Sequence, residues 1–209
     1  MVDAEGNRPC SLADDRMPTR HPDRHVSLPQ RSVVASTVMT MSPIERPERI
    51  EQSRVADEAD ALWGMLDFSR ATLVLKCSGL DDEQLARRSV PPSNLSLLGL
   101  LRHMSDVEVW WFGHVFAGVP VTYAFDPEMV GDDFNKPSGS PGAVVSEKFL
   151  ECVAQSNALT VGQNLDTLAV NTDTPINLRF VAVHMIKEYA RHCGHADLLR
   201  EVIDGETGD

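Results

Sequence analysis

The proline-free segment at residues 178–203 constrains the fold of this chain more than any other feature. Its apolar residues recur at the three- and four-residue spacing of an α-helix that buries one face. We expect the buried positions to be Phe180, Val181, Ile186, Leu198, Leu199 and Val202. A helix of this length buries its apolar face only against other helices or a sheet.

Three earlier segments show the same periodicity, so we predict an all-α four-helix bundle. The first helix is expected from about Pro47 and Glu48, residues typical of a helix N-terminus, to Ser78–Gly79. The second is expected from residues 94–96 to 117–118, and the third over 143–158 with an extension toward 168. The predicted apolar positions of these helices are Leu62, Met65, Leu66, Leu73, Leu75, Leu97, Leu100, Leu101, Met104, Val107, Trp110, Trp111, Val115, Val144, Phe149, Val153 and Leu159.

Residues 120–141 predict a long loop between the second and third helices. At up to about 3.3 Å per residue it can run the length of a bundle, which allows those two helices to lie parallel. Loops of this length in a compact domain usually carry function, so we expect it to form one wall of a substrate entrance.

Residues 1–44 are rich in proline and carry five Arg against five Asp or Glu, which predicts a disordered tail ahead of a single domain at 45–209. An alternative is that translation starts downstream, at Met39 or Met41. The remaining residues carry the whole net charge of −12. An acidic domain repels phosphate backbones, so nucleic-acid binding is disfavoured.

The cysteines Cys10, Cys77, Cys152 and Cys193 are widely spaced and include no CxxC pair. This usage indicates reduced thiols in a cytoplasmic protein, and we interpret Cys193 as a small packed residue. No segment approaches the roughly 18 apolar residues of a membrane span, so no membrane association is expected. The acidic faces neither require nor exclude a homodimer.

Polar residues on the last helix point to a metal site. His184, Glu188, His192 and His195 form one stripe, in which Glu188 and His192 are one turn and about 40° apart. A helix that contributes two ligands needs a third from elsewhere, and the best candidate is His103, at the edge of the apolar stripe of the second helix. Two imidazoles and a carboxylate suit Zn²⁺ with an open position, and also Fe(II) or Ni(II).

Each of these residues also has a simpler interpretation. A lone histidine at such an edge is usually a satisfied core residue, and Glu–His pairs occur on many solvated helix faces. Asp106 is a candidate to orient a ligand from the outer shell. His184 and His195 are interpreted as rim residues, with a general base or ligand-orienting role as the alternative.

The chain resembles a known superfamily through two motifs. His103 lies on a helix that continues through the pair Trp110–Trp111 to Ala-Gly, and the late helix contains ARHCGHADLLRE. Together these motifs resemble the DinB-like superfamily, within it the actinobacterial mini-circle or DUF664 branch, over roughly residues 45–207. The resemblance implies a four-helix bundle that holds a divalent metal between its helices. The chain also resembles mycothiol-dependent maleylpyruvate isomerase in its His, Glu, His ligand set. This resemblance implies His103, Glu188 and His192 as the ligands.

The function that this resemblance implies is a metal-dependent thiol S-transferase, which joins mycothiol or a similar thiol co-substrate to a small electrophile. Zinc is the expected metal, with nickel or iron as alternatives, and no catalytic residue can be assigned. Two other functions stay open: a metal-dependent hydrolase, and a non-enzymatic bundle that binds metal or a small molecule under stress.

Overall fold

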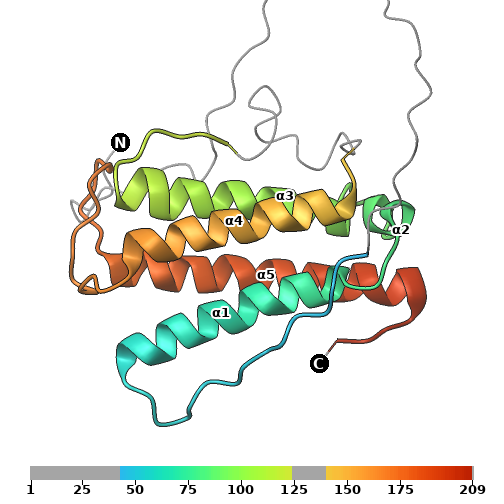
Figure 1. Ribbon diagram of the computed structural model, residues 1–209, viewed down its shortest axis with the longest axis horizontal. Coiled ribbons are helices and arrows are strands. Elements are labelled where there is room, and N and C mark those ends of the chain that lie inside the picture. Colours follow the sequence, from blue (N-terminus) through green and yellow to red (C-terminus); the bar gives the residue numbers. More distant parts are fainter. Residues whose placement is uncertain (1–42, 124–139, 209) are drawn as a thin grey trace, which may run out of the picture.

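The computed structural model describes residues 43–123 and 140–208, and these form helices without any strand (Figure 1). The helices in chain order are α1 (Glu58–Cys77), α2 (Asp82–Ala86), α3 (Leu97–Glu108), η1 (Val109–Phe116), α4 (Gly142–Thr160) and α5 (Leu178–Asp204). The predicted all-α bundle is therefore confirmed. The tail at 1–42 and most of the predicted loop, residues 124–139, lie outside the described residues.

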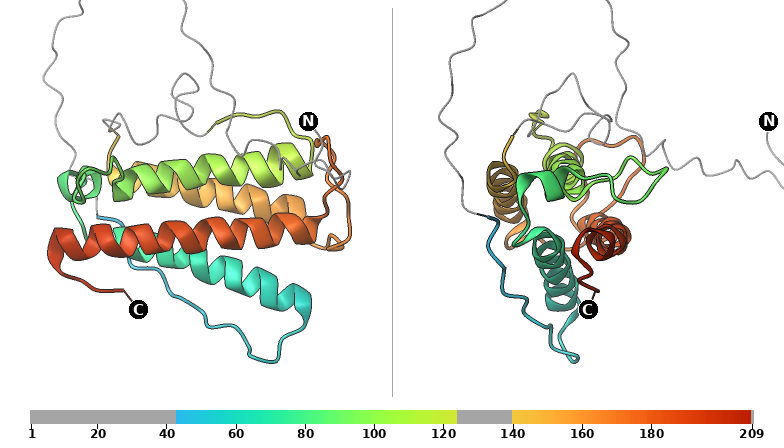
Figure 2. Two further views of the ribbon diagram at one scale, coloured as in Figure 1. Left: turned by 180° about the vertical axis from the view of Figure 1, so that it is seen from behind. Right: turned by 90° about the vertical axis from the view of Figure 1, so that its right-hand side faces the viewer.

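The four long helices form two pairs (Figures 1 and 2). α1 lies beside α5, and both run toward the end of the bundle that carries α2. α3 lies beside α4, and both run away from that end. The second and third long helices are thus parallel, an arrangement that the length of the connection between them allows.

The ends of the helices follow local capping chemistry. The side chains of Asp57, Ser96 and Asn177 accept hydrogen bonds from the backbone N–H three residues ahead, at 2.9, 3.1 and 3.0 Å. Each bond satisfies one of the free donors in a first turn. α5 ends where Gly205 takes a left-handed conformation with φ of 82°, which glycine adopts without a steric penalty.

The prediction for the first helix is wrong at its start. Residues 43–57 contain no helix, and α1 begins only at Glu58, because Asp57 provides the cap. The preceding segment packs along the bundle instead: Ile44 is buried and its carbonyl accepts a hydrogen bond from Gly79 N–H at 3.1 Å. The predicted connection after residue 79 also contains α2, which a reciprocal cap between Asp81 and Gln84 stabilises.

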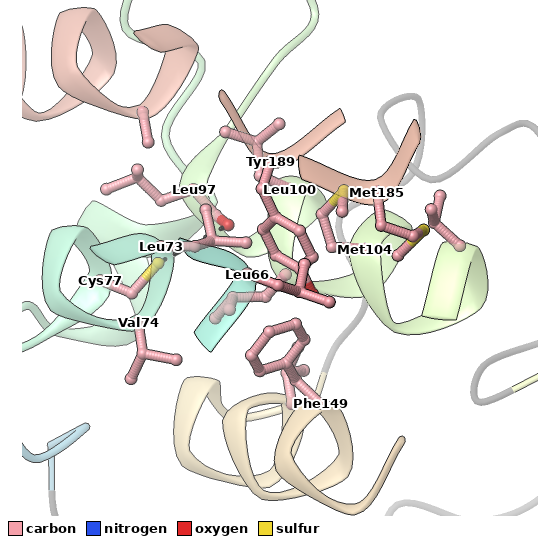
Figure 3. Packing of buried hydrophobic residues seen from close by; sticks show 14 of the residues in the cluster. Leu66, Leu73, Val74, Cys77, Leu97, Leu100, Met104, Phe149, Met185 and Tyr189 are labelled. Carbon is pink, nitrogen blue, oxygen red and sulfur yellow. Dashed lines mark hydrogen bonds between the residues drawn. The ribbon is translucent and has the colours of Figure 1, made fainter. Parts of the chain in front are cut away.

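The core lies between the four long helices, and its largest side chains come from all of them (Figure 3). Fully buried examples are Leu66, Leu73, Leu100, Met104, Phe149, Met185 and Tyr189. Other predicted core positions are exposed, namely Met65, Val144, Phe180, Leu198 and Val202. Phe180 and Leu198 are five full turns apart on α5, so both lie on the face that no other described helix covers.

The second predicted helix changes type in its middle. It is α-helical to Glu108 and then continues as the π-helix η1, in which Ala117 N–H donates to the Phe112 carbonyl five residues back, at 3.2 Å. π-turns are rare and appear frequently at functional sites. The periodicity of the apolar residues does not distinguish such a turn from an α-turn.

Candidate functional site

Two of the three predicted ligands meet across the bundle. The ring of His103, on α3, lies edge-on to the ring of His192, on α5, with centroids 4.9 Å apart and planes 71° apart. His192 is buried and His103 is half-buried. His192 of α5 therefore lies against His103 of α3, the second long helix.

Glu188 completes the set from the preceding turn of α5. Its carboxylate lies between two imidazoles, 3.8 Å from His192 Nε2 and 3.6 Å from His184 Nε2. Two ligand atoms that each lie about 2.1 Å from a tetrahedral zinc are about 3.4 Å apart. The separation between Glu188 and His192 is therefore close to the value for two ligands of one cation.

The side chains of His103, Glu188 and His192 do not form a closed coordination sphere in the structure. Within residues 43–123 and 140–208, no group of three or more His, Cys, Asp or Glu side chains has the arrangement of a metal site. The donor chemistry nevertheless fits a divalent cation, since two imidazoles and one carboxylate come from adjacent positions on two packed helices. The ligand set remains a prediction.

The protonation states also suit metal binding. Burial, together with the neighbouring His103 and His195, lowers the pKa of His192 to about 4, so the ring is neutral at pH 7. Burial by itself raises the pKa of Glu188, but a hydrogen bond from Lys187 and the charge of Arg191 outweigh it, and the pKa lies below its usual value. A neutral imidazole and an ionised carboxylate are the forms that bind metals.

The second nitrogen of His192 has a neighbour of its own. His195 Nδ1 lies 3.4 Å from His192 Nδ1, on the side of the ring away from Glu188. A metal-binding histidine usually pairs its other nitrogen with a partner that fixes the ring orientation. This contact agrees with the ligand-orienting alternative that the sequence leaves open for His195.

Aromatic rings form one wall of the site. The ring of Trp111, on η1, packs against the His184 ring with centroids 4.0 Å apart. The ring of Phe180 stacks on the same imidazole with centroids 6.2 Å apart. In a regular α-helix, Trp111 and His103 are about 80° apart around the axis. Because a π-turn contains more residues per turn, η1 brings Trp111 back toward the face of His103.

A buried polar network lies beside the donor set, and sequence analysis missed it. Arg70 donates two hydrogen bonds to Glu108, both 2.8 Å, and Tyr189 Oη donates to the same carboxylate at 2.7 Å. Glu108 and Tyr189 are completely buried. One signal was present in the sequence, because Glu108 is a charged residue on the apolar stripe between Met104 and Trp111.

Two other predicted residues have defined surroundings. Cys193 packs against the core, and its Sγ donates to the Ser69 carbonyl at 3.5 Å, which matches its interpretation as a packed residue. Asp106 is buried, and its charge adds to the effect of burial in raising the pKa of Tyr123. Its predicted role in the outer shell of a metal site stays a prediction.

Comparisons with known proteins show the family and the fold of the chain. The family model described as mycothiol-S-transferase matches residues 61–205. The chain belongs to the mycothiol S-transferase family. The match begins within α1 and reaches the cap of α5, so it includes all four long helices and the three predicted ligands.

The mycothiol S-transferase family has a DinB-like fold, and a solved structure shares this fold. It is a conserved protein from Enterococcus faecalis, with 15% sequence identity and a TM-score of 0.52 over 73% of this chain and 100% of that chain. A search among curated proteins gave no match. In the described part of the chain, no helix combines the length and the apolar character that crossing a membrane requires.

Proposed function

We propose that this member of the mycothiol S-transferase family binds one divalent metal ion, most readily Zn²⁺, through His103, Glu188 and His192. In this role the protein joins a low-molecular-weight thiol of the mycothiol type to a small electrophile. The observation that supports the metal site most directly is the contact between His103 and His192, with Glu188 one turn away. Family membership supports the thiol chemistry.

A bound divalent cation would lower the pKa of a coordinating thiol, so that the thiolate prevails at neutral pH. The residues of the chain prepare this chemistry in specific ways. His192 keeps a free lone pair because burial lowers its pKa, and His195 orients its ring. Trp111 and Phe180 pack against His184, whose Nε2 lies 3.6 Å from the Glu188 carboxylate.

The cysteines in the described residues are poor nucleophiles, which supports an external thiol. Burial raises the pKa of Cys152 to about 11 and that of Cys193 to about 12, and it raises the pKa of Cys77 strongly as well. The thiolate is the reactive form of a thiol, so these side chains are largely unreactive at pH 7. The sulfur that attacks the electrophile is therefore expected to come from the co-substrate.

Metal content and conjugation activity test the proposal together. The protein is purified without a histidine tag, its metal is measured by elemental mass spectrometry, and thiol consumption is followed with mycothiol and a model electrophile. His103→Ala is compared with His114→Ala, a matched control. His114 packs against Trp110 and Asn171 rather than against His192.

We expect about one metal per chain and conjugation in the wild type and in His114→Ala, and loss of both in His103→Ala. Absence of metal from the wild type, even after loading, would refute the metal site. Bound metal without thiol conjugation would refute the transferase role. Cleavage of model esters would then favour the hydrolase alternative, and no turnover at all would favour a binding protein.

A further inference from the structure

A hydrogen-bond network around Arg70 connects all four long helices of the bundle; Arg70, Glu108 and Tyr189 are buried and Asn157 is exposed. Arg70 is on α1, and its guanidinium forms a two-bond pair with Glu108 at the end of α3. The same guanidinium donates to Asn157 Oδ1 on α4 at 2.9 Å, and Tyr189 on α5 donates to Glu108. Four residues, one from each long helix, thus form one continuous set of hydrogen bonds.

Two members of the network are close in sequence to the predicted ligands. Tyr189 directly follows Glu188 and precedes His192 by three residues. Glu108 follows His103 by five residues and is the last residue before η1. The rotation of α3 and α5 about their axes decides whether these ligands face one another. The network holds Glu108 of α3 and Tyr189 of α5 in defined directions.

The apolar contacts beside the site define this rotation less strictly. The fully buried residues next to His103 and His184 are Met104 and Met185 (Figure 3). Methionine is flexible and adapts to small rotations of a helix, and apolar burial has no directional preference. A two-bond pair between a guanidinium and a carboxylate has a fixed planar geometry, which a rotation of either helix would break.

We propose that the network of Arg70, Glu108, Asn157 and Tyr189 is a positioning device, which sets the rotation of α3 and α5 so that His103 meets Glu188 and His192. This inference rests on the proposed metal site and adds to it the residues that assemble it. None of the four residues is proposed to touch the metal or the substrate.

Tyr189→Phe is the variant that tests this inference most sharply. It removes one hydroxyl from the network and keeps the ring in the core, so the bundle is expected to fold. The matched control is Leu199→Ala, which opens a cavity at a buried position on the same helix, seven residues beyond His192. Leu199→Ala weakens packing around α5 and leaves the network intact, whereas Tyr189→Phe disturbs the network and keeps the packing of the ring.

The readout is Co²⁺ binding, followed by the visible absorption of the bound ion, together with thermal unfolding of the metal-free protein. We expect Tyr189→Phe to lose about tenfold in Co²⁺ affinity and to show a changed absorption spectrum. Leu199→Ala is expected to keep the affinity and spectrum of the wild type at a lower melting temperature.

Three other results would overturn the inference. The first is wild-type Co²⁺ affinity and spectrum in Tyr189→Phe. The second is an equal loss of affinity in both variants, which would mean that general destabilisation is the cause. The third is absence of Co²⁺ binding in the wild type, which would remove the proposed metal site as well, whereas the first two leave that site intact.

Discussion

Glu188 lies between two histidines of its own helix, 3.6 Å from His184 and 3.8 Å from His192, while the ring of His103 packs against His192 from α3. This relationship brings a carboxylate and an imidazole of α5 close to an imidazole of α3 through pairwise contacts. The residues that are expected to bind metal are distinct from the apolar residues that hold the bundle together.

Glu188→Ala should abolish metal binding and leave the bundle folded. In the structure the carboxylate forms ion pairs with Lys187 and Arg191, at 3.2 and 3.0 Å, and both of these side chains are about half exposed. Because both cations stay in contact with water, although the Glu188 side chain is only 12% exposed, we expect these pairs to contribute only about 1 kcal/mol to stability. Elemental analysis and circular dichroism check this expectation. Loss of helical signal in the variant would instead indicate a structural site.

His195→Ala should weaken metal binding without abolishing it. His195 contacts the nitrogen of His192 that points away from Glu188, so its removal frees the ring to rotate. Removal of such an outer partner typically costs about 10–100-fold in metal affinity. Competition with a chromophoric chelator measures the effect. An unchanged affinity would show that His195 is only a rim residue.

Glu108→Gln should destabilise the fold severely, by about 3–5 kcal/mol, because it removes the buried carboxylate that pairs with the Arg70 guanidinium and leaves only the exposed Asp67 as a charged partner. Urea unfolding measures the loss. The matched control is Glu151→Gln, which removes an exposed partner of Lys148 and should change the free energy of unfolding by no more than about 1 kcal/mol. Similar stability in the two variants would contradict the importance of the buried pair.

Alkylation of Cys152 and Cys193 should be slow at pH 7 and accelerate as the pH rises. Burial raises the pKa of these thiols to about 11 and about 12, so the thiolate fraction stays small over the neutral range. Mass spectrometry after timed treatment with iodoacetamide gives the rate at each cysteine, and urea-unfolded protein provides the reference. Native rates equal to the unfolded rates would show that the thiols are accessible and ionised.

Asp204 should contribute to the loss of stability in acid. Burial raises its pKa slightly, but hydrogen bonds from Arg200 and from a backbone N–H outweigh this, so the pKa lies below its usual value in the folded protein. The unfolded state therefore takes up the proton first, and the contribution present at neutral pH is lost as the pH falls below about 4. The slope of unfolding free energy against pH should be shallower there in Asp204→Asn. An identical slope would exclude this pair as a source of acid sensitivity.

The order of the long helices and most of their ends could be predicted from the sequence, whereas the ligand set of His103, Glu188 and His192 stays a prediction. Helical periodicity and capping residues are local properties, so the extent of α5 and its stripe of Glu188 and His192 follow from residue spacing alone. The length of the chain between α3 and α4 allows their parallel arrangement but does not impose it. The start of α1 was misplaced because Pro47 and Glu48 resemble a helix opening, while the cap that defines it is Asp57.

Only the tertiary structure decided which faces of the helices meet. Spacing cannot distinguish Phe180 and Leu198, which are exposed, from Val181 and Leu199, which are buried, because the apolar stripe of α5 is wider than the surface that its neighbours cover. The contact between His103 and His192 depends on the rotation of two helices far apart in the sequence. The network of Arg70, Glu108 and Tyr189 depends in the same way on long-range packing, because its hydrogen bonds form only when α1, α3 and α5 enclose the same buried space.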